Sequence, residues 1–191
     1  MTLAVPVHSW PGPLPRWDAQ GLDPVLVISV LHADGATREQ ARIRIREAVR
    51  EALSQALGIA IERIAVHSNP GSAPRLEIEG WAGSPGLSIS HAGALSMAAI
   101  NRHGAVGLDL MQVQATSDWA RVAHDYLGMA AACRLAASPG PERPLAFARA
   151  WAEREACLKL HGEPLAEWTP LPACRVLVLA APAGLAGAVA L

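Results

Sequence analysis

The stretch Trp151-Ala-Glu-Arg-Glu-Ala-Cys-Leu-Lys159 predicts a helix that gathers one large ring and two opposite charges on a single face. Residues four apart lie on the same side of a helix, so Trp151, Glu155 and Lys159 would stand in a row. The same spacing fits a plain surface ion pair between Glu155 and Lys159, worth about 0.3–0.5 kcal/mol. Taken alone, the stretch leaves both interpretations open.

A second segment, Val106-Gly-Leu-Asp-Leu110, places an acid inside an apolar run that is typical of a strand. An ionised carboxylate among apolar neighbours is costly to bury unless a cation or several hydrogen-bond donors meet it. Asp109 is therefore a candidate functional residue. A position at the end of a strand, facing water, is the alternative.

A third segment, Leu87-Ser-Ile-Ser-His-Ala-Gly93, sets two hydroxyls and an imidazole beside a glycine. The alternation of Ser88 and Ser90 by itself indicates only that one strand face is polar. His91 by itself is more often an ordinary core or surface histidine than a ligand.

The composition is that of a soluble globular protein, with 191 residues, 51% hydrophobic residues and a net charge of −1. Six tryptophans against one tyrosine and one phenylalanine exclude the mixed aromatic and basic pattern of a single-strand binder. We expect no nucleic-acid partner. The basic residues gather on the first predicted helix, at Arg42, Arg44, Arg46 and Arg50, and suit a small polyanion better than a polymer.

Cys133, Cys157 and Cys174 are odd in number, widely spaced and form no CxxC pair. They predict reduced cytosolic thiols, with neither a disulfide framework nor a zinc site. The amino terminus lacks the basic and apolar regions of a signal peptide, and Arg175 and Pro182 interrupt the apolar tail. We therefore expect a cytoplasmic protein without a membrane partner.

A strand, a long helix and several short strands are predicted twice, once before residue 101 and once after it. Residues 1–24 form an irregular lead-in that packs Trp10 and Trp17 against the body. The expected strands are 25–31, 61–67, 75–79, 87–90, 96–101, 106–110, 175–179 and 185–189, and the expected helices are 37–57, 118–127, 129–137 and 145–161. This order predicts an α+β fold of two similar halves, residues 1–100 and 101–191.

Together, Ser90-His91, Gly107-Leu-Asp109 and the stretch 151–159 resemble, in this order and spacing, the Sfp-type phosphopantetheinyl transferases. The resemblance implies an enzyme of the holo-acyl-carrier-protein synthase type. Such an enzyme transfers the phosphopantetheine arm of coenzyme A to a serine of an acyl or peptidyl carrier protein and requires magnesium. It also implies that the two halves are in a pseudo-two-fold arrangement, that the metal site lies in the C-terminal half, and that the protein acts as a monomer.

The resemblance implies a role for each matching residue. Asp109 and Glu155 correspond to the magnesium ligands, and Glu155 would orient or deprotonate the serine hydroxyl. Lys159 would neutralise the pyrophosphate and so serve both catalysis and coenzyme A binding. Ser90 and His91 correspond to contacts with the coenzyme A phosphates, with His91 on the ribose phosphate, whereas Trp151 is structural.

The chain departs from the family pattern at several positions. Arg154 replaces the lysine that precedes the glutamate, and the glycine-base-proline signature is blurred, so that Arg75 stands in for its base. Arg42 lies near the position of a family arginine that binds the ribose phosphate. Met111 stands where many members have a further acid, which predicts a two-carboxylate metal site. The alternative function is a coenzyme A or carrier-protein binding module with weak or no transferase activity.

Overall fold

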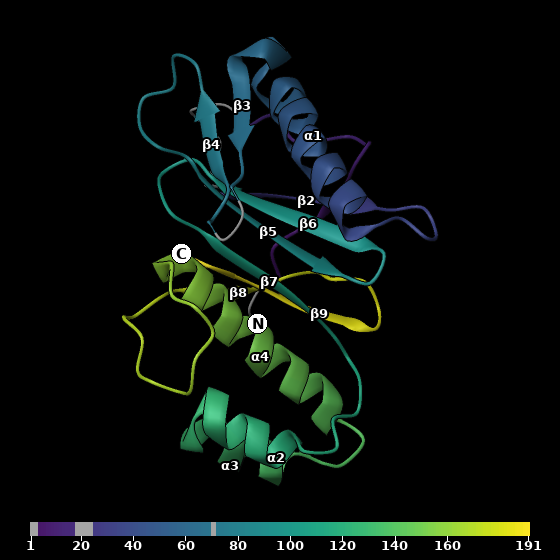
Figure 1. Cartoon of the computed structure of the whole chain (residues 1–191), viewed down its shortest axis with the longest axis vertical. Helices are drawn as coiled ribbons and strands as arrows, with labels where there is room; N and C mark the ends of the chain where they lie inside the picture. Colours follow the sequence, from purple (N-terminus) through teal and green to yellow (C-terminus); the bar gives the residue numbers. More distant parts are fainter. Residues whose placement is uncertain (1–3, 18–24, 70–71) are drawn as a thin grey trace. The chain divides into compact units, whose positions relative to one another are not determined.

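The computed structural model describes residues 4–17, 25–69 and 72–191, and its contacts divide the chain into two compact units, Val5–Val106 and Gly107–Leu191 (Figure 1). Each unit combines helices with a largely antiparallel sheet, which confirms the predicted α+β class. The division lies after the strand that ends at Asn101, because the turn that follows this strand belongs with the first unit.

The first unit is a four-stranded sheet, in the order β1-β2-β6-β5, with one long helix. Its elements are β1 (His8–Ser9), β2 (Val25–Leu31), α1 (Arg38–Leu57), the 3-10 turn η1 (Ile61–Arg63), β3 (Ile64–His67), β4 (Arg75–Ile78), β5 (Gly86–Ala92) and β6 (Leu95–Asn101). Helix α1 begins where the Thr37 side chain accepts a hydrogen bond from the Gln40 backbone, and it ends at Gly58, which has a φ of 67°. The expected strand 61–67 therefore begins with a 3-10 turn.

The core of the first unit lies between the sheet and α1. Alternate residues of β2 face the helix because side chains along a strand point to opposite faces in turn. Leu26, Ile28 and Val30 of β2 thereby join Val49 and other apolar residues of α1 in one buried cluster. The lead-in packs Trp10 and Trp17 against this cluster, as the sequence predicts.

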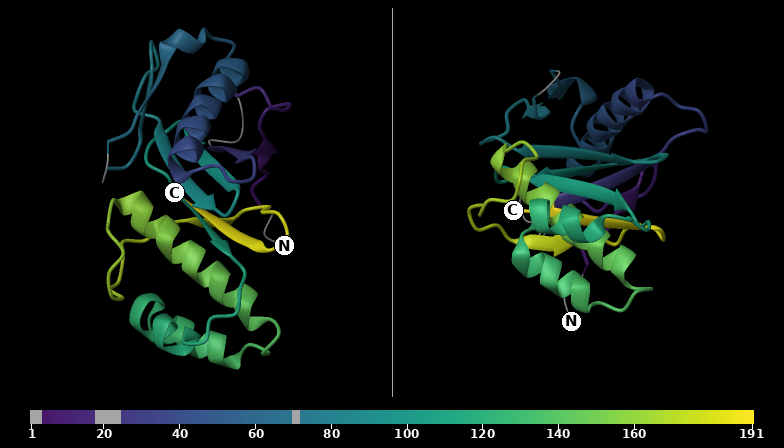
Figure 2. Two further views of the ribbon diagram at one scale, coloured as in Figure 1. Left: turned by 45° about the vertical axis from the view of Figure 1, so that its right-hand side comes forward. Right: turned by 60° about the horizontal axis from the view of Figure 1, so that its bottom comes forward.

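The second unit is a three-stranded sheet, in the order β7-β9-β8, with α4 packed against β7 and β9 (Figure 2). Its elements are β7 (Gly107–Gln112), α2 (Trp119–Val122), the π-helical turn η2 (Ala123–Leu127), α3 (Met129–Ala137), α4 (Arg143–His161), β8 (Val176–Val178) and β9 (Leu185–Ala190). The expected helix 118–127 is therefore a short α-helix that continues into a π-helical turn. Helix α4 ends at Gly162, which has a φ of 70°.

The two units repeat one topology. In each, a first strand leads to a long helix, and two later strands pair so that the last strand lies between the other two. The order β2-β6-β5 of the first unit thus returns as β7-β9-β8 in the second, with antiparallel pairing throughout. This shared topology supports the prediction of two similar halves. Their pseudo-two-fold arrangement stays a prediction.

Small residues allow α4 to lie close to its sheet. Ala152 and Ala156 of the helix are fully buried against Ala188 and Ala190 of β9. The closest approach is at Gly107, the first residue of β7. A Cβ at this position would overlap the carbonyl oxygen of Ala156 and lie 2.7 Å from the Leu160 nitrogen. The glycine of the Gly107-Leu-Asp109 segment is thus required by packing.

We expect Gly107→Ala to destabilise the protein by about 3 kcal/mol, because a new methyl group would collide with helix backbone that cannot move aside easily. Chemical denaturation monitored by circular dichroism measures the change. Gly140→Ala is the matched control, since a Cβ there meets no atom within 4 Å. Equal stability of the two variants would contradict the close approach.

The structure corrects the prediction for two of the three cysteines. Cys157 of α4 and Cys174 form a disulfide, whereas Cys133 is free and exposed. The segment after α4 returns along the helix, so that Leu171 and Cys174 pack against the cluster that contains Cys157. Their spacing of 17 residues gave no indication of this pairing. The cysteines thus no longer support a cytoplasmic location, which stays a prediction.

No helix in the described part of the chain has both the length and the apolar character needed to cross a membrane.

Candidate active site

Strand β7 and helix α4 bring together the three charged residues that the sequence singles out in the C-terminal half. Lys159 Nζ donates to Asp109 Oδ1 at 2.7 Å and to the Leu108 carbonyl at 3.0 Å. Asp109 is buried, with 8% of its surface exposed. Lys159 is therefore a cation that meets the buried Asp109, and the water-facing alternative for this acid is wrong.

Glu155 lies one helical turn before Lys159 and close enough to Asp109 to feel its charge. Burial raises the pKa of Glu155 above its ordinary value, and repulsion from the Asp109 carboxylate raises it further, although Lys159 and Arg154 oppose the rise. Lys159 forms its ion pair with Asp109 across the two elements. Among the described residues, no ion pair links Lys159 to Glu155, so the simple surface pair is wrong.

The raised pKa of Glu155 predicts that Glu155→Gln stabilises the fold at neutral pH. A carboxyl whose pKa is higher in the folded than in the unfolded state opposes folding once it ionises. The variant should therefore melt at a higher temperature than the natural protein at pH 7 to 8. The gap should close as the pH falls through the raised value towards the ordinary glutamate pKa of about 4.3. A lower melting temperature for the variant at pH 8 would contradict this.

The donor set fits magnesium, as judged from the chemistry of these side chains. Two neighbouring carboxylates that repel each other offer the oxygen ligands and the negative charge that a hard cation prefers. Within the described residues there is no cluster of three or more acidic, histidine or cysteine side chains. Magnesium commonly uses one or two carboxylates together with waters and substrate phosphates, so Asp109 and Glu155 are sufficient.

Trp151 fixes α4 in position. Its ring lies 6.0 Å from both the Tyr126 and the Phe147 rings, at the border of the cluster formed by η2, α3 and α4. Met111, two residues after Asp109 on β7, packs against the same cluster. Met111 and Asp109 therefore both face α4, as their alternation along the strand predicts.

In the first unit, the predicted residues Ser90 and His91 lie on opposite faces of β5. His91 lies on the face of β5 that packs against α1, and its Nδ1 lies 2.5 Å from Ser96 Oγ. Ser96 in turn lies 2.6 Å from Nε2 of His32, which comes directly after β2. Ser90 is buried on the other face, with 5% of its surface exposed.

His91 lines a pocket of about 490 Å³ beside the start of α1. His32, Asp34, Thr37 and Arg38 also line it. We did not predict His32, Ser96 or Arg38 from the sequence. The available signal was weak: His32 directly follows a predicted strand, and Arg38 lies in the first turn of a predicted helix.

The two predicted arginines of the first unit lie elsewhere. Arg42 forms an ion pair with Glu39 at 3.9 Å, and Arg75 forms one with Glu77 at 2.7 Å. Both side chains are more than half exposed, and neither lines the pocket that contains His91. The ion pairs of Arg42 and Arg75 give no support to a role in coenzyme A binding, which stays a prediction.

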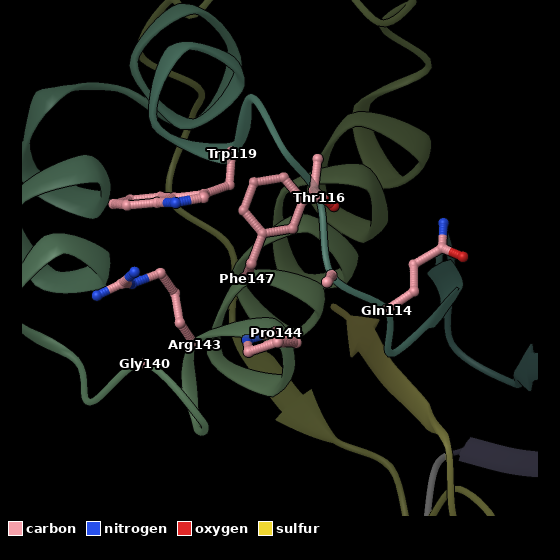
Figure 3. Close-up of a pocket in the computed structure, with 8 residues that line it drawn as sticks. Gln114, Thr116, Trp119, Gly140, Arg143, Pro144 and Phe147 are labelled. Atoms are coloured by element: carbon pink, nitrogen blue, oxygen red, sulfur yellow. The ribbon is translucent and has the colours of Figure 1, made fainter.

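A second pocket, of about 160 Å³, lies among the helices of the second unit (Figure 3). The Arg143 guanidinium lies 4.6 Å from the Trp119 ring centre and donates to the carbonyls of Leu135 and Ser138. Figure 3 shows Phe147 beside this stacked pair. The arginine is thus held by structural contacts, and none of the predicted site residues lines this pocket.

Comparison with known proteins agrees with the resemblance seen in the sequence. A search of curated proteins found no match. Residues 105–187 match the family model of the 4'-phosphopantetheinyl transferase superfamily, and this region includes β7, α4, Asp109, Glu155 and Lys159. We therefore place the C-terminal region of the chain, residues 105–187, in the 4'-phosphopantetheinyl transferase superfamily.

Proposed function

We propose that this protein transfers the phosphopantetheine arm of coenzyme A to a serine hydroxyl of an acyl or peptidyl carrier protein, with magnesium as the cofactor. The observation that carries the proposal is the Asp109, Glu155 and Lys159 cluster, which lies within the region that matches the family. Two acids and one amine, brought together where α4 packs on β7, could serve as a cation site and a phosphate contact.

Each of the three residues has a role that its surroundings support. The Glu155 carboxylate, at the contact of α4 with β7, would orient the serine hydroxyl or accept its proton, directly or through water. The Lys159 ammonium, already held by Asp109, can stabilise negative charge that develops on the leaving adenosine bisphosphate. Asp109 and Glu155 would hold magnesium, which when bound would neutralise the pyrophosphate charge.

Intact-mass spectrometry of a panel of carrier proteins tests the proposal. Each carrier is incubated with the protein, coenzyme A and magnesium, and one carrier should gain the mass of one phosphopantetheine group. A matched carrier in which the acceptor serine is replaced by alanine is the control and should gain nothing. If no acyl or peptidyl carrier is modified while coenzyme A remains intact, the proposal is contradicted.

The same experiment separates transfer from two other functions, a binding module and a metal-dependent phosphoesterase that would use the same acids on small phosphates. A binding module would retain coenzyme A or the carrier without modifying either, and the position of Met111 against the apolar cluster, where many relatives have an acid, is the observation that favours this rival. A phosphoesterase would release free phosphopantetheine in the absence of any carrier. Chromatography of the small-molecule fraction distinguishes these outcomes.

A further inference from the structure

One serine hydroxyl lies between two imidazoles in the first unit. Ser96 is fully buried in the central strand β6, opposite His91 of β5 and Val30 of β2. Its Oγ lies 2.5 Å from Nδ1 of His91 and 2.6 Å from Nε2 of His32. Both histidines line the pocket of about 490 Å³ beside the start of α1.

The chemistry of a hydroxyl couples the two rings. A serine has one proton to donate, so when it donates to one imidazole it is free to accept from the other. If Ser96 donates to His32 Nε2, then its oxygen accepts the Nδ1 proton of His91. This direction requires a neutral His32 with its own proton on Nδ1, and it leaves His91 able to hold a proton on each nitrogen.

The surroundings of His32 favour this direction. Burial lowers the pKa of His32, and the positive charge of Arg44 on α1 lowers it further. The other charged side chains that line the pocket are Asp34 and Arg38. The lowered pKa favours the neutral form of His32, and a neutral ring with its proton on Nδ1 can accept the Ser96 hydroxyl proton at Nε2.

We propose that His32 is a positioning residue that, through Ser96, holds His91 in its doubly protonated form for binding the phosphate monoester on the ribose of coenzyme A. The proposal rests on the proposed function for the identity of the ligand. A cationic imidazole is opposite in charge to a phosphate dianion, and Arg38 at the same pocket adds a second positive charge. In this arrangement, His32 supports phosphate binding without touching the phosphate.

The first test determines which ring nitrogens of His32 and His91 carry a proton. Nitrogen NMR of the protein labelled at histidine should show His32 protonated on Nδ1 alone and His91 protonated on Nδ1. On addition of coenzyme A, His91 should become protonated on both nitrogens. A proton on Nε2 of His32, or an unprotonated Nδ1 of His91, would overturn the proposal, whatever the transferase activity is.

The second test is calorimetry with coenzyme A and dephospho-coenzyme A, which lacks the ribose phosphate. The natural protein should prefer coenzyme A by about tenfold or more at pH 6, and the preference should be smaller at pH 8.5, well above the ordinary histidine pKa of about 6.5. His32→Leu and Ser96→Ala should reduce the preference to about twofold or less and remove its pH dependence. His32→Gln should retain much of the preference, because an amide oxygen can accept the Ser96 proton.

His67→Leu is the matched control, because His67 pairs with Glu77 on the separate strand pair of β3 and β4. Its preference for coenzyme A should be unchanged. If His32→Leu binds both ligands with the natural ratio and pH dependence, the positioning role is overturned. The natural protein could prefer coenzyme A over dephospho-coenzyme A as expected and yet modify no carrier. This result would contradict only the proposed transfer, and it would support the phosphate site.

Discussion

Replacing Asp109 by asparagine or Glu155 by glutamine is expected to lower phosphopantetheine transfer about 100-fold or more. Either change removes one of the two carboxylates that we assign to magnesium, and with it part of the alignment of the phosphates. Glu155→Gln also removes the proposed base. Both variants should fold, because asparagine and glutamine keep the shape of the natural side chains and remove a charge that is costly to bury.

The measurement is the initial rate of carrier modification at several magnesium concentrations. Glu153→Gln is the matched control, because Glu153 lies on the same helix, two residues away, and is exposed. It should keep the natural rate. If the two site variants lose activity only at low magnesium and recover fully when it is raised, the residues bind the metal without a further role. Full activity at all magnesium concentrations would contradict the assignment.

Local signals were sufficient to predict several elements of both units. Strand Val25–Leu31 agrees with the expected range, and the expected helix 145–161 begins two residues late. A continuous apolar run identifies the strand, and Gly58 and Gly162 mark the ends of the two long helices. These features depend on residues close together in the sequence.

The sequence indicated that a buried Asp109 would meet a cation, but it did not indicate which residue supplies that cation. The sequence showed that a buried Asp109 needs a cation, and helical spacing suggested that Lys159 would pair with Glu155. The structure instead joins Lys159 to Asp109, fifty positions away. Helical spacing describes neighbours on one helix, whereas this contact depends on how α4 packs on β7, which Gly107 allows.

The histidine pair and the disulfide were missed for the same reason. His32 and Ser96 are 64 positions apart and meet because β2 and β6 pair in one particular register. A shift of one residue would have turned Ser96 to the opposite face. Cys157 and Cys174 meet because the segment after α4 returns along the helix, and its prolines and glycine gave no periodic pattern from which to predict that path.

Lys159 has a structural contact and a proposed chemical role, and a double-mutant cycle separates them. Lys159→Met should lower the free energy of unfolding by about 2 kcal/mol, because it removes a 2.7 Å ion pair and hydrogen bond from the buried Asp109 carboxylate. This estimate allows for the partial exposure of the lysine side chain, 32% of which is accessible. In the Asp109→Asn background the same change should cost about 0.5 kcal/mol or less, since the neutral amide needs no cation.

The affinity for coenzyme A should respond differently from stability. If Lys159 contacts the pyrophosphate, Lys159→Met should weaken coenzyme A binding about tenfold in both backgrounds, because the ammonium is lost whether or not residue 109 carries a charge. Denaturation and calorimetry on the same four proteins give both cycles. A loss of affinity in the natural background that disappears with Asp109→Asn would show that Lys159 acts only by holding Asp109, and it would contradict the phosphate contact.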